Sequence, residues 1–246
     1  MKRFFITSLF LFTFLLGTDS FPEWFLYQGR FPDITVGFSY GSSSEETDAE
    51  RLYCAYQECY AYGTLYRYQD FDQKHSDYFY IFSPDSLAAI KGKLNQHGRF
   101  ASNLILRQYI GAFSKKKTLE LQKDLISIAS LPKPDWISGR PFFQDDTYYY
   151  GVGSYPLGGN QNDAWKTAEE RAVFTIMTGL AVQFHSVIIS GKAEEDDDFE
   201  KVMAERLKYR LRNIQVMERY LDRSKSQVLV MVRILKGDVF SPMLKK

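Results

Sequence analysis

Residues 147–180 read TYYYGVGSYPLGGNQNDAWKTAEERAVFTIMTGL, and this stretch decides the class of the fold. Its first part, Thr147 to Tyr155, is rich in Tyr and Val and predicts a β-strand. The turn residues of 156–162 follow, and Asp163 is placed to cap the start of a helix. The sequence therefore predicts a strand, a turn and a helix in close succession.

The predicted helix has one apolar face that contains several small residues. An apolar residue recurs every four positions, with larger side chains beside it: Ala164, Ala168, Ala172, Ile176 and Leu180, then Val173, Met177 and Phe184. This spacing is typical of an amphipathic helix. Because alanine adds little bulk, we expect the helix to lie close to a sheet.

The rest of the C-terminal half predicts two more strand regions and a helix. The expected elements are a short strand at Ser186–Ser190, a charged helix at Phe199–Leu211, and a closing hairpin of Asn213–Leu221 with Gln227–Leu235. The acidic run 194–198 precedes the charged helix, where negative charge complements the helix dipole.

The N-terminal half repeats landmarks of the C-terminal half. At offsets of 112, 116 and 115 residues, Pro22–Phe25 recurs as Pro134–Ile137, Val36–Tyr40 as Val152–Tyr155, and Asp48-Ala49 as Asp163-Ala164. Self-similarity of this kind predicts a duplicated structural unit. Chance similarity between two strand–loop–helix units is the alternative.

After these landmarks the first half departs from the second. The expected elements are a helix at Thr47–Tyr62, a strand at Asp77–Phe82, a helix from Pro84 to about Leu94, and further helix over Phe100–Ala129. No closing hairpin is evident in this half.

The predicted fold class is α+β, with two tandem small modules. Each module is expected to be a short antiparallel or mixed sheet with an amphipathic helix packed on it, and extra helices elaborate the first. The proline-rich stretch Leu131–Pro134 marks the boundary. The domain prediction is a signal peptide at 1–20, a first module with a helical insertion at 21–131, and a second module at 132–246.

The N-terminus has the pattern of a secretory signal. Lys2 and Arg3 supply positive charge, 4–16 is largely apolar, and small residues at 17–20 allow cleavage after Ser20. The apolar run is too short to span a bilayer comfortably. An uncleaved anchor or a buried first helix is the alternative. We expect an exported chain, periplasmic or associated with the outer membrane, with no integral membrane span once processed.

Cys54 and Cys59 are the only cysteines of the chain. On one continuous helix their Cα atoms would lie about 8 Å apart, beyond the reach of an unstrained disulfide. We therefore expect two partly buried free thiols. No His or second Cys pair follows at zinc spacing, so a metal site is not predicted.

Charge and motif content disfavour nucleic-acid binding and catalysis. The 31 basic and 30 acidic residues give a net charge of +1, which provides no broad footprint for phosphates. The three histidines are isolated from one another in the sequence, and no G-x-S-x-G elbow occurs. Gly151-Val152-Gly153 is followed by Pro156 where a dinucleotide site needs its third glycine. We predict no catalytic residue, no cofactor and no metal ligand.

Aromatic side chains are the predicted binding groups. Tyr148, Tyr149 and Tyr150 are consecutive, so strand alternation turns at least one of them away from the core. Together with Trp136 they are the predicted interaction surface. Packing of the same rings between sheet and helix is the alternative.

Several short motifs of the C-terminal half resemble the LPP-twenty lipoprotein family. They are Pro134-x-Trp136, a Tyr-rich strand ending in Gly151-Val152-Gly153, Glu170-Arg171-Ala172 in an Ala-patterned helix, and the strand Val228–Arg233. The resemblance covers residues 134–236, with an echo in 22–83. It implies a small envelope module, in some members associated with flagellar outer-membrane structures, and it implies no catalytic residues. The lipobox cysteine of typical members has no counterpart here.

The leading hypothesis is a non-catalytic, exported cell-envelope protein with a structural or protein-interaction role, in a flagellar or outer-membrane-associated assembly. Its expected partners are envelope proteins, glycan or further copies of the chain. An exported hydrolase acting on envelope polymers is one alternative. Paired carboxylates or a Ser–His pair in a cleft would favour it. A periplasmic ligand-binding domain is the other, and it needs a preformed pocket between the modules.

Overall fold

The computed structural model describes residues 20–39, 41–68, 71–81, 83–122, 124–190 and 203–240, without the side chains of 59–82 and 181–208. Residues 1–19 of the predicted signal segment and the acidic run 194–198 lie outside the described residues.

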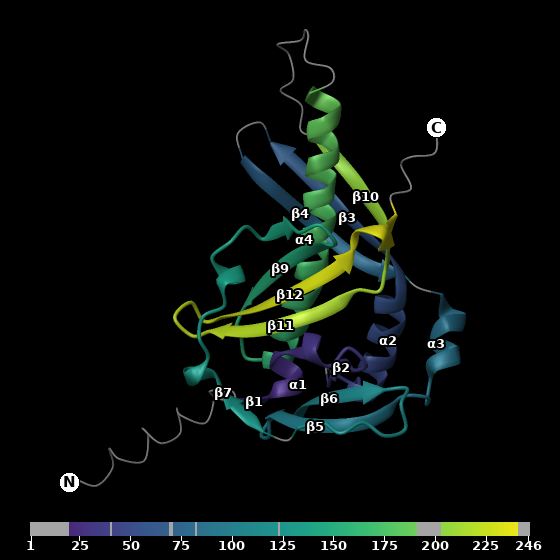
Figure 1. Cartoon of the computed structure of the whole chain (residues 1–246), viewed down its shortest axis with the longest axis vertical. Coiled ribbons are helices and arrows are strands. Elements are labelled where there is room, and N and C mark those ends of the chain that lie inside the picture. Colours follow the sequence, from purple (N-terminus) through teal and green to yellow (C-terminus); the bar gives the residue numbers. More distant parts are fainter. Residues whose placement is uncertain are drawn as a thin grey trace, which may run out of the picture.

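Helices and strands alternate irregularly along the described chain (Figure 1). The helices are α1 (Glu23–Leu26), α2 (Glu45–Gln57), α3 (Pro84–Ile90) and α4 (Gln161–Ser190), with short 3-10 turns η2 (Gln28–Arg30), η3 (Ile128–Ser130), η4 (Asp135–Ile137) and η5 (Lys236–Asp238). The strands are β1 (Ser20–Pro22), β2 (Thr35–Phe38), β3 (Glu58–Tyr68), β4 (Phe71–Ile81), β5 (Asn95–Asn103), β6 (Gln108–Ser114), β7 (Leu125–Ser127), β8 (Phe142–Gln144), β9 (Tyr148–Pro156), β10 (Met203–Arg212), β11 (Gln215–Asp222), β12 (Gln227–Leu235) and β13 (Val239–Phe240).

The fold is α+β, as predicted, with antiparallel sheets and helices packed on them. The strand orders are β2-β6-β5, β11-β12-β9-β8, β13-β10-β3-β4 and the small β1-β7 ribbon. Helix α2 packs against β2 and β6, and the long helix α4 packs against β9 and β12 (Figure 1). In the described part of the chain, no helix has both the length and the apolar character needed to cross a membrane.

The two halves have the same order of elements and the same strand pairing. Each contains a strand, a helix, a long strand and a closing hairpin in that order: β2–α2–β3 with β5–β6, and β9–α4–β10 with β11–β12. The first half has β4 and α3 in addition, between β3 and β5. In each half the first strand pairs with the last, which pairs in turn with the strand before it. The long strands β3 and β10 pair with each other, Glu58 lying opposite Arg212. One sheet therefore contains strands of both halves.

In both halves a glycine brings the first strand against its helix. A Cβ at Gly37 would overlap the carbonyl oxygen of Glu45 and lie 2.8 Å from the Cβ of Ala49. A Cβ at Gly153 would likewise overlap the carbonyl oxygen of Ala168 and the amide nitrogen of Ala172. Glycine and alanine thus permit backbone contact between helix and sheet, as the alanine stripe predicted.

These contacts revise the alignment of the two helices. By its contact with the glycine, Ala49 is equivalent to Ala172, whereas the sequence landmarks paired it with Ala164. A second helix–strand contact in each half agrees with this revised alignment. Asp48 Oδ2 accepts from the Phe38 amide at 3.1 Å, and Arg171 Nη1 donates to the Ser154 carbonyl at 2.9 Å. Each residue precedes the contact alanine, and each binds the residue that follows the glycine.

Three predictions for the first half are wrong. The helix expected to reach Tyr62 ends at Gln57, and Cys59 lies on β3. The helix expected over 100–129 is replaced by β5, β6 and β7, so this half does have a closing hairpin. The cause is strand pairing between distant segments, which offsets weak local preferences. The helix expected from Pro84 is confirmed as α3, ending at Ile90. Residues 77–81 of the strand expected at 77–82 lie within β4, and residue 82 is outside the described residues.

The second half also differs from expectation after its first helix. Residues 186–190 continue α4 and form no strand, and β10 occupies most of the stretch expected to be a charged helix. The period of two in β10 explains this, because Tyr209 and Leu211 are buried while Arg210 and Arg212 face outward. Asn160 caps α4 in place of Asp163, accepting from the Asp163 amide at 3.1 Å. The predicted strand at 147–155 and the closing hairpin are confirmed.

A buried ion pair lies where the halves meet. The side chains of Arg219 on β11 and Glu169 on α4 are 0% and 2% exposed, and Nη2 lies 2.5 Å from Oε2. The Tyr56 hydroxyl of α2 also donates to Glu169. Arg219 Nη1 donates to the Phe25 carbonyl and to Gln28 Oε1, each at 2.8 Å. The pair therefore joins the N-terminal segment to helices of both halves.

Gly153→Ala is expected to lower the free energy of unfolding by about 2 kcal/mol or more, because the new methyl group would overlap helix backbone that cannot rotate away. Urea unfolding followed by circular dichroism measures this. Gly158→Ala is the matched control: nothing lies within 4 Å of its Cβ, so a change of at most about 0.5 kcal/mol is expected. Equal stabilities for the two variants would contradict the close approach.

Arg219→Met is expected to destabilise the protein by about 3–5 kcal/mol, because it leaves the buried Glu169 carboxyl without its counter-charge. The double variant Arg219→Met with Glu169→Gln is expected to recover a large part of this loss. The Gln oxygen still accepts the Tyr56 hydroxyl, and neither charge remains buried. Urea titrations of the single and double variants give both values. A double variant no more stable than Arg219→Met would count against the pair.

Candidate functional site

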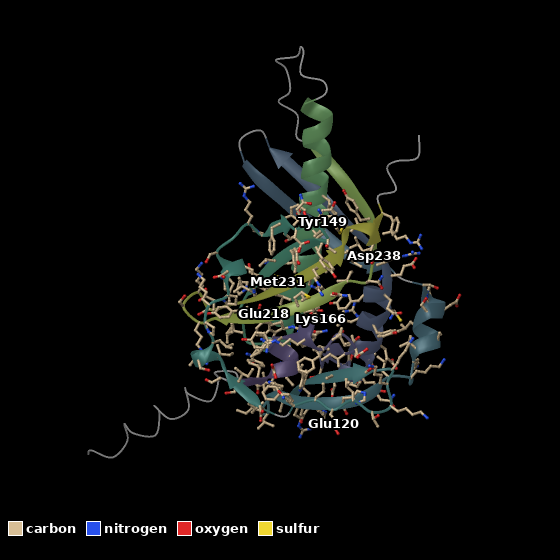
Figure 2. The ribbon with its side chains drawn as sticks, in the orientation of Figure 1. Glu120, Tyr149, Lys166, Glu218, Met231 and Asp238 are labelled. Carbon is tan, nitrogen blue, oxygen red and sulfur yellow. The ribbon has the colours of Figure 1, made fainter. Side chains whose placement is uncertain are left out.

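One face of the β11-β12-β9-β8 sheet is covered by α4, and the opposite face carries most of the predicted binding residues. Strand alternation sets the division, since Gly151 and Gly153 face the helix and Tyr150 and Val152 therefore face away. Arg233 lies opposite Tyr150 and Met231 opposite Val152 across β12. Glu218 of β11 lies opposite Met231 and is therefore on the same face, and both residues are labelled in Figure 2. We call this surface the aromatic face and define it by Trp136, Phe143, Tyr148, Tyr150, Met231 and Arg233.

The rings of the aromatic face are stacked and oriented by one another. Phe143 of β8 and Tyr150 of β9 lie 4.7 Å apart between ring centroids and are 4° from parallel. Tyr148 lies 6.1 Å from Tyr150, and the Arg233 guanidinium carbon lies 4.3 Å from the centre of the Tyr148 ring. Arg233 Nε donates to Gln215 Oε1 at 2.8 Å, which holds the guanidinium in place. The surface is therefore ordered before any partner binds.

Tyr149 belongs to the other side of the sheet. Its ring stacks on Phe142 at 6.0 Å, and Phe142 occupies the space that a side chain at Gly179 of α4 would need. Of the four predicted surface residues, the structure thus places Tyr148 and Tyr150 on the aromatic face and packs Tyr149 against the core. For Tyr149 the alternative considered at the sequence level, packing between sheet and helix, describes its position.

Trp136 lies over the same outer face, although it comes from η4 and not from the sheet. Its indole Nε1 donates to Glu218 Oε2 at 2.7 Å. Burial raises the pKa of the Glu218 carboxyl, and the hydrogen bond from the indole opposes that rise. The hydrogen bond fixes the segment that contains Trp136 onto β11.

Asp145 anchors the edge of the aromatic face. Its carboxylate accepts the Tyr150 hydroxyl and the Thr147 and Tyr148 amides, each at 2.7 Å. These bonds lower the pKa of Asp145, with the Tyr150 hydroxyl the largest cause. Burial, and next the Asp145 carboxylate, raise the pKa of Tyr150. The Tyr150 ring is therefore held as a neutral hydrogen-bond donor at its outer end.

Sequence reasoning missed half of the aromatic face. Phe143, Met231 and Arg233 lie on β8 and β12, and only the strand register brings them beside the tyrosines. The alternation of Val228, Val230 and Val232 with other residues was visible in the sequence, and it could have marked Met231 and Arg233 as outward-facing. Nothing local to Phe143 indicated that it would stack on Tyr150.

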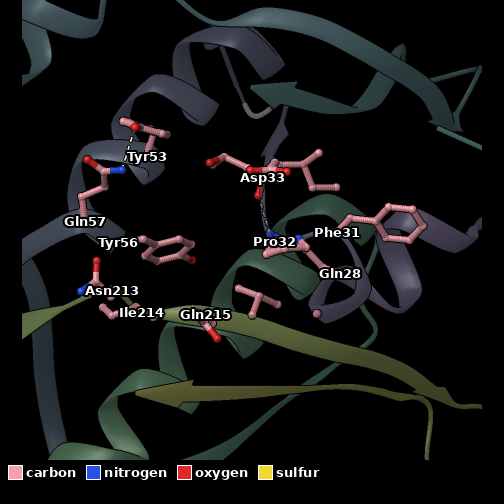
Figure 3. Close-up of a pocket in the computed structure, with 14 residues that line it drawn as sticks. Gln28, Phe31, Pro32, Asp33, Tyr53, Tyr56, Gln57, Asn213, Ile214 and Gln215 are labelled. Carbon is pink, nitrogen blue, oxygen red and sulfur yellow. Dashed lines mark hydrogen bonds between the residues drawn. The ribbon is translucent and has the colours of Figure 1, made fainter. Parts of the chain in front are cut away.

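A small pocket lies between the halves (Figure 3). Its volume is about 170 Å³, and it is lined by the loop around Asp33, by Tyr53 and Tyr56 of α2, and by residues 213–216. Gln57 Nε2 donates to the Tyr53 hydroxyl at 2.6 Å at its rim. Drug-sized ligands occupy pockets of about 300–1,000 Å³, so this one suits water or a very small polar molecule.

The structure also describes the surroundings of some of the cysteines and histidines considered in the sequence analysis. Cys54 is a buried free thiol, as predicted, and the side chain of Cys59 lies outside the described residues. His97 Nε2 lies 3.0 Å from the Lys116 carbonyl oxygen. Among the described side chains, no three or more His, Cys, Asp or Glu residues are grouped to hold a metal ion.

Comparison of the chain with protein families, with curated proteins and with solved structures found no match.

Tyr150→Phe is expected to raise the pKa of Asp145 toward its ordinary value, because the variant loses the hydroxyl that lowers it most. Stability from Asp145 is present above its unfolded pKa and is lost as pH falls through the lower folded pKa. The variant should therefore lose that stability at a higher pH. Carboxyl NMR titration measures the shift.

Tyr148→Phe is the matched control, since Tyr148 binds Asp145 only through its backbone amide. An Asp145 pKa that is the same in Tyr150→Phe and in the wild type would refute the role given to the hydroxyl.

Proposed function

We propose that this chain is an exported, non-catalytic cell-envelope protein that binds an envelope protein through its aromatic face. The observation that carries the proposal is the composition of that face. It combines Trp136, Phe143 and two tyrosines with Met231 and Arg233 on one side of a sheet whose other side is covered by α4. Aromatic residues, Met and Arg are the types enriched at the centres of protein interfaces.

The order of the rings adds to this proposal. Side chains that are already stacked lose little conformational freedom when a partner covers them, so more of the contact energy remains for binding. Tyr and Trp also combine a large apolar ring with a polar tip that stays hydrogen-bonded. A protein surface with matching apolar and acidic groups would fit the rings and Arg233.

The export part of the proposal draws on the sequence. Basic residues, an apolar run and small residues precede Ser20, and the resemblance of 134–236 to the LPP-twenty family implies an envelope location, in some members a flagellar or outer-membrane assembly. Phe21, which would begin the processed chain, is fully buried. A chain that begins at Phe21 therefore keeps every described core residue.

Two measurements in the native cells test the proposal. Fractionation of the chain, with its N-terminal residue determined, is expected to place it outside the inner membrane and to begin it at Phe21. A photo-crosslinking residue at position 148 or 150 is expected to give one discrete crosslinked product from the envelope. A chain found in the cytoplasm would refute export. The absence of a crosslinked product from both positions 148 and 150 would refute the binding face.

Position 109 provides the matched control for crosslinking. Tyr109 of β6 also has an arginine over its ring, with the Arg99 guanidinium carbon at 3.8 Å, but it lies on the sheet of the other half. Crosslinks of the same mass and yield from 109 would mean that tyrosine exposure alone, and not the aromatic face, produces the product. Tyr150→Ser in an otherwise crosslinking chain should reduce the yield from 148 by about tenfold, the effect of losing one interface anchor.

A further inference from the structure

The turn of the β5–β6 hairpin presents three consecutive aliphatic side chains to solvent. Leu104, Ile105 and Leu106 are 74%, 68% and 53% exposed. Single exposed aliphatic residues are common on protein surfaces, but a contiguous exposed group marks an interaction site. We call Leu104, Ile105 and Leu106 the apolar tip.

The apolar tip is held by a defined turn. Asn103 Oδ1 accepts from the Leu106 amide at 2.9 Å, and the Leu104 carbonyl accepts from the Arg107 amide at 3.3 Å. Arg107 closes the turn with a φ of 50°, a conformation that costs energy for a residue with a side chain. The strained residue and its bonds keep the three aliphatic side chains together at the end of the hairpin.

The residues that flank the tip indicate what covers it. In the chain the tip lies between two polar residues, Asn103 and Arg107, and Arg107 is exposed. Exposed apolar side chains beside polar ones match the boundary of a bilayer, where apolar groups enter the acyl region to about 5–10 Å and polar groups stay among the headgroups. The exposed cation of Arg107 is suited to anionic lipid phosphates.

The position of the tip in the fold agrees with a membrane contact. Residues 1–19, with the apolar run 4–16, precede β1, and β1 lies at the same end of the molecule as the β5–β6 turn (Figure 1). Phe21 of β1 packs on Phe100 of β5 at 5.6 Å between ring centroids. Leu125 of β7, which pairs with β1, is another exposed aliphatic residue there. The end of the fold at which the described chain begins therefore carries four exposed aliphatic side chains.

We propose that the apolar tip inserts into the surface of a phospholipid bilayer and that this contact holds the processed chain reversibly at the membrane. The inference rests on the export proposed above, but it uses a different surface from the aromatic face. Three aliphatic side chains give weak attachment, in the range of a single acyl chain, for which the binding constant is about 10⁴ M⁻¹. The aromatic face would remain free to bind a protein partner.

Flotation with lipid vesicles tests the proposal. The chain from Phe21 to Lys246 is used, because every described core residue lies within it and the leader is removed as a competing membrane ligand. With vesicles of phosphatidylethanolamine and phosphatidylglycerol, we expect the chain to float and Ile105→Asp to lower the partition coefficient about tenfold or more. Ile105→Leu should bind as the wild type does.

The control is Leu235→Asp, which places the same charge at an exposed aliphatic position on β12, away from the tip. It should bind vesicles within about twofold of the wild type, the ordinary effect of a remote surface substitution. Equal thermal unfolding midpoints verify that Ile105→Asp is folded, since its side chain makes no core contact.

A wild-type chain that stays with the unbound protein, or a variant Ile105→Asp that floats as well as the wild type, would overturn the proposal. The proposal would also be overturned if the wild type bound no vesicles and Ile105→Asp lost a crosslink to a protein. That result would assign the tip to a protein partner. A chain found in the cytoplasm that still floats with vesicles would instead refute only the proposed export. The two failures are therefore distinguishable.

Discussion

The guanidinium of Arg219 is closed off from water, so its charge has to be balanced inside the fold. Glu169 supplies the counter-charge, Tyr56 and Gln28 supply further hydrogen bonds, and the Phe25 ring lies 4.6 Å from the guanidinium carbon. These residues come from α4, α2, η2 and α1. Because burial disfavours both charged forms, raising the pKa of Glu169 and lowering that of Arg219, the arrangement tolerates little rearrangement of its partners. The N-terminal segment and both halves are thereby fixed relative to one another.

Close contact between helix and strand depends on glycine at the point of contact. Gly37 and Gly153 let α2 and α4 touch the sheets with their backbones, and this leaves one face of each sheet covered. In the second half the opposite face is then available for large side chains. The aromatic face is thus a consequence of the glycines as much as of the tyrosines, since a residue and its neighbour in a strand must lie on opposite sides.

Some of this could be predicted from particular residues. Consecutive tyrosines at 148–150 indicated that at least one ring faces outward, and Trp136 was among the predicted surface residues. The stacking partner Phe143 and the neighbour Arg233 could not be found, because their positions depend on the register of β8, β9 and β12. The apolar tip was hidden for a related reason: a helix predicted over 100–129 would have distributed Leu104, Ile105 and Leu106 around its surface.

The sequence by itself determined the class of the fold, the first strand and long helix of the C-terminal half, its closing hairpin, and the closeness of helix to strand. These follow from local periodicity and residue size, which neighbours in the chain set. Only the tertiary structure decided that β3 and β10 are strands that pair across the halves, that the first half closes with β5–β6, and that Arg219 meets Glu169. Those outcomes depend on hydrogen bonds and charges between residues far apart in the chain, and local preferences of about 1 kcal/mol or less are too small to determine them.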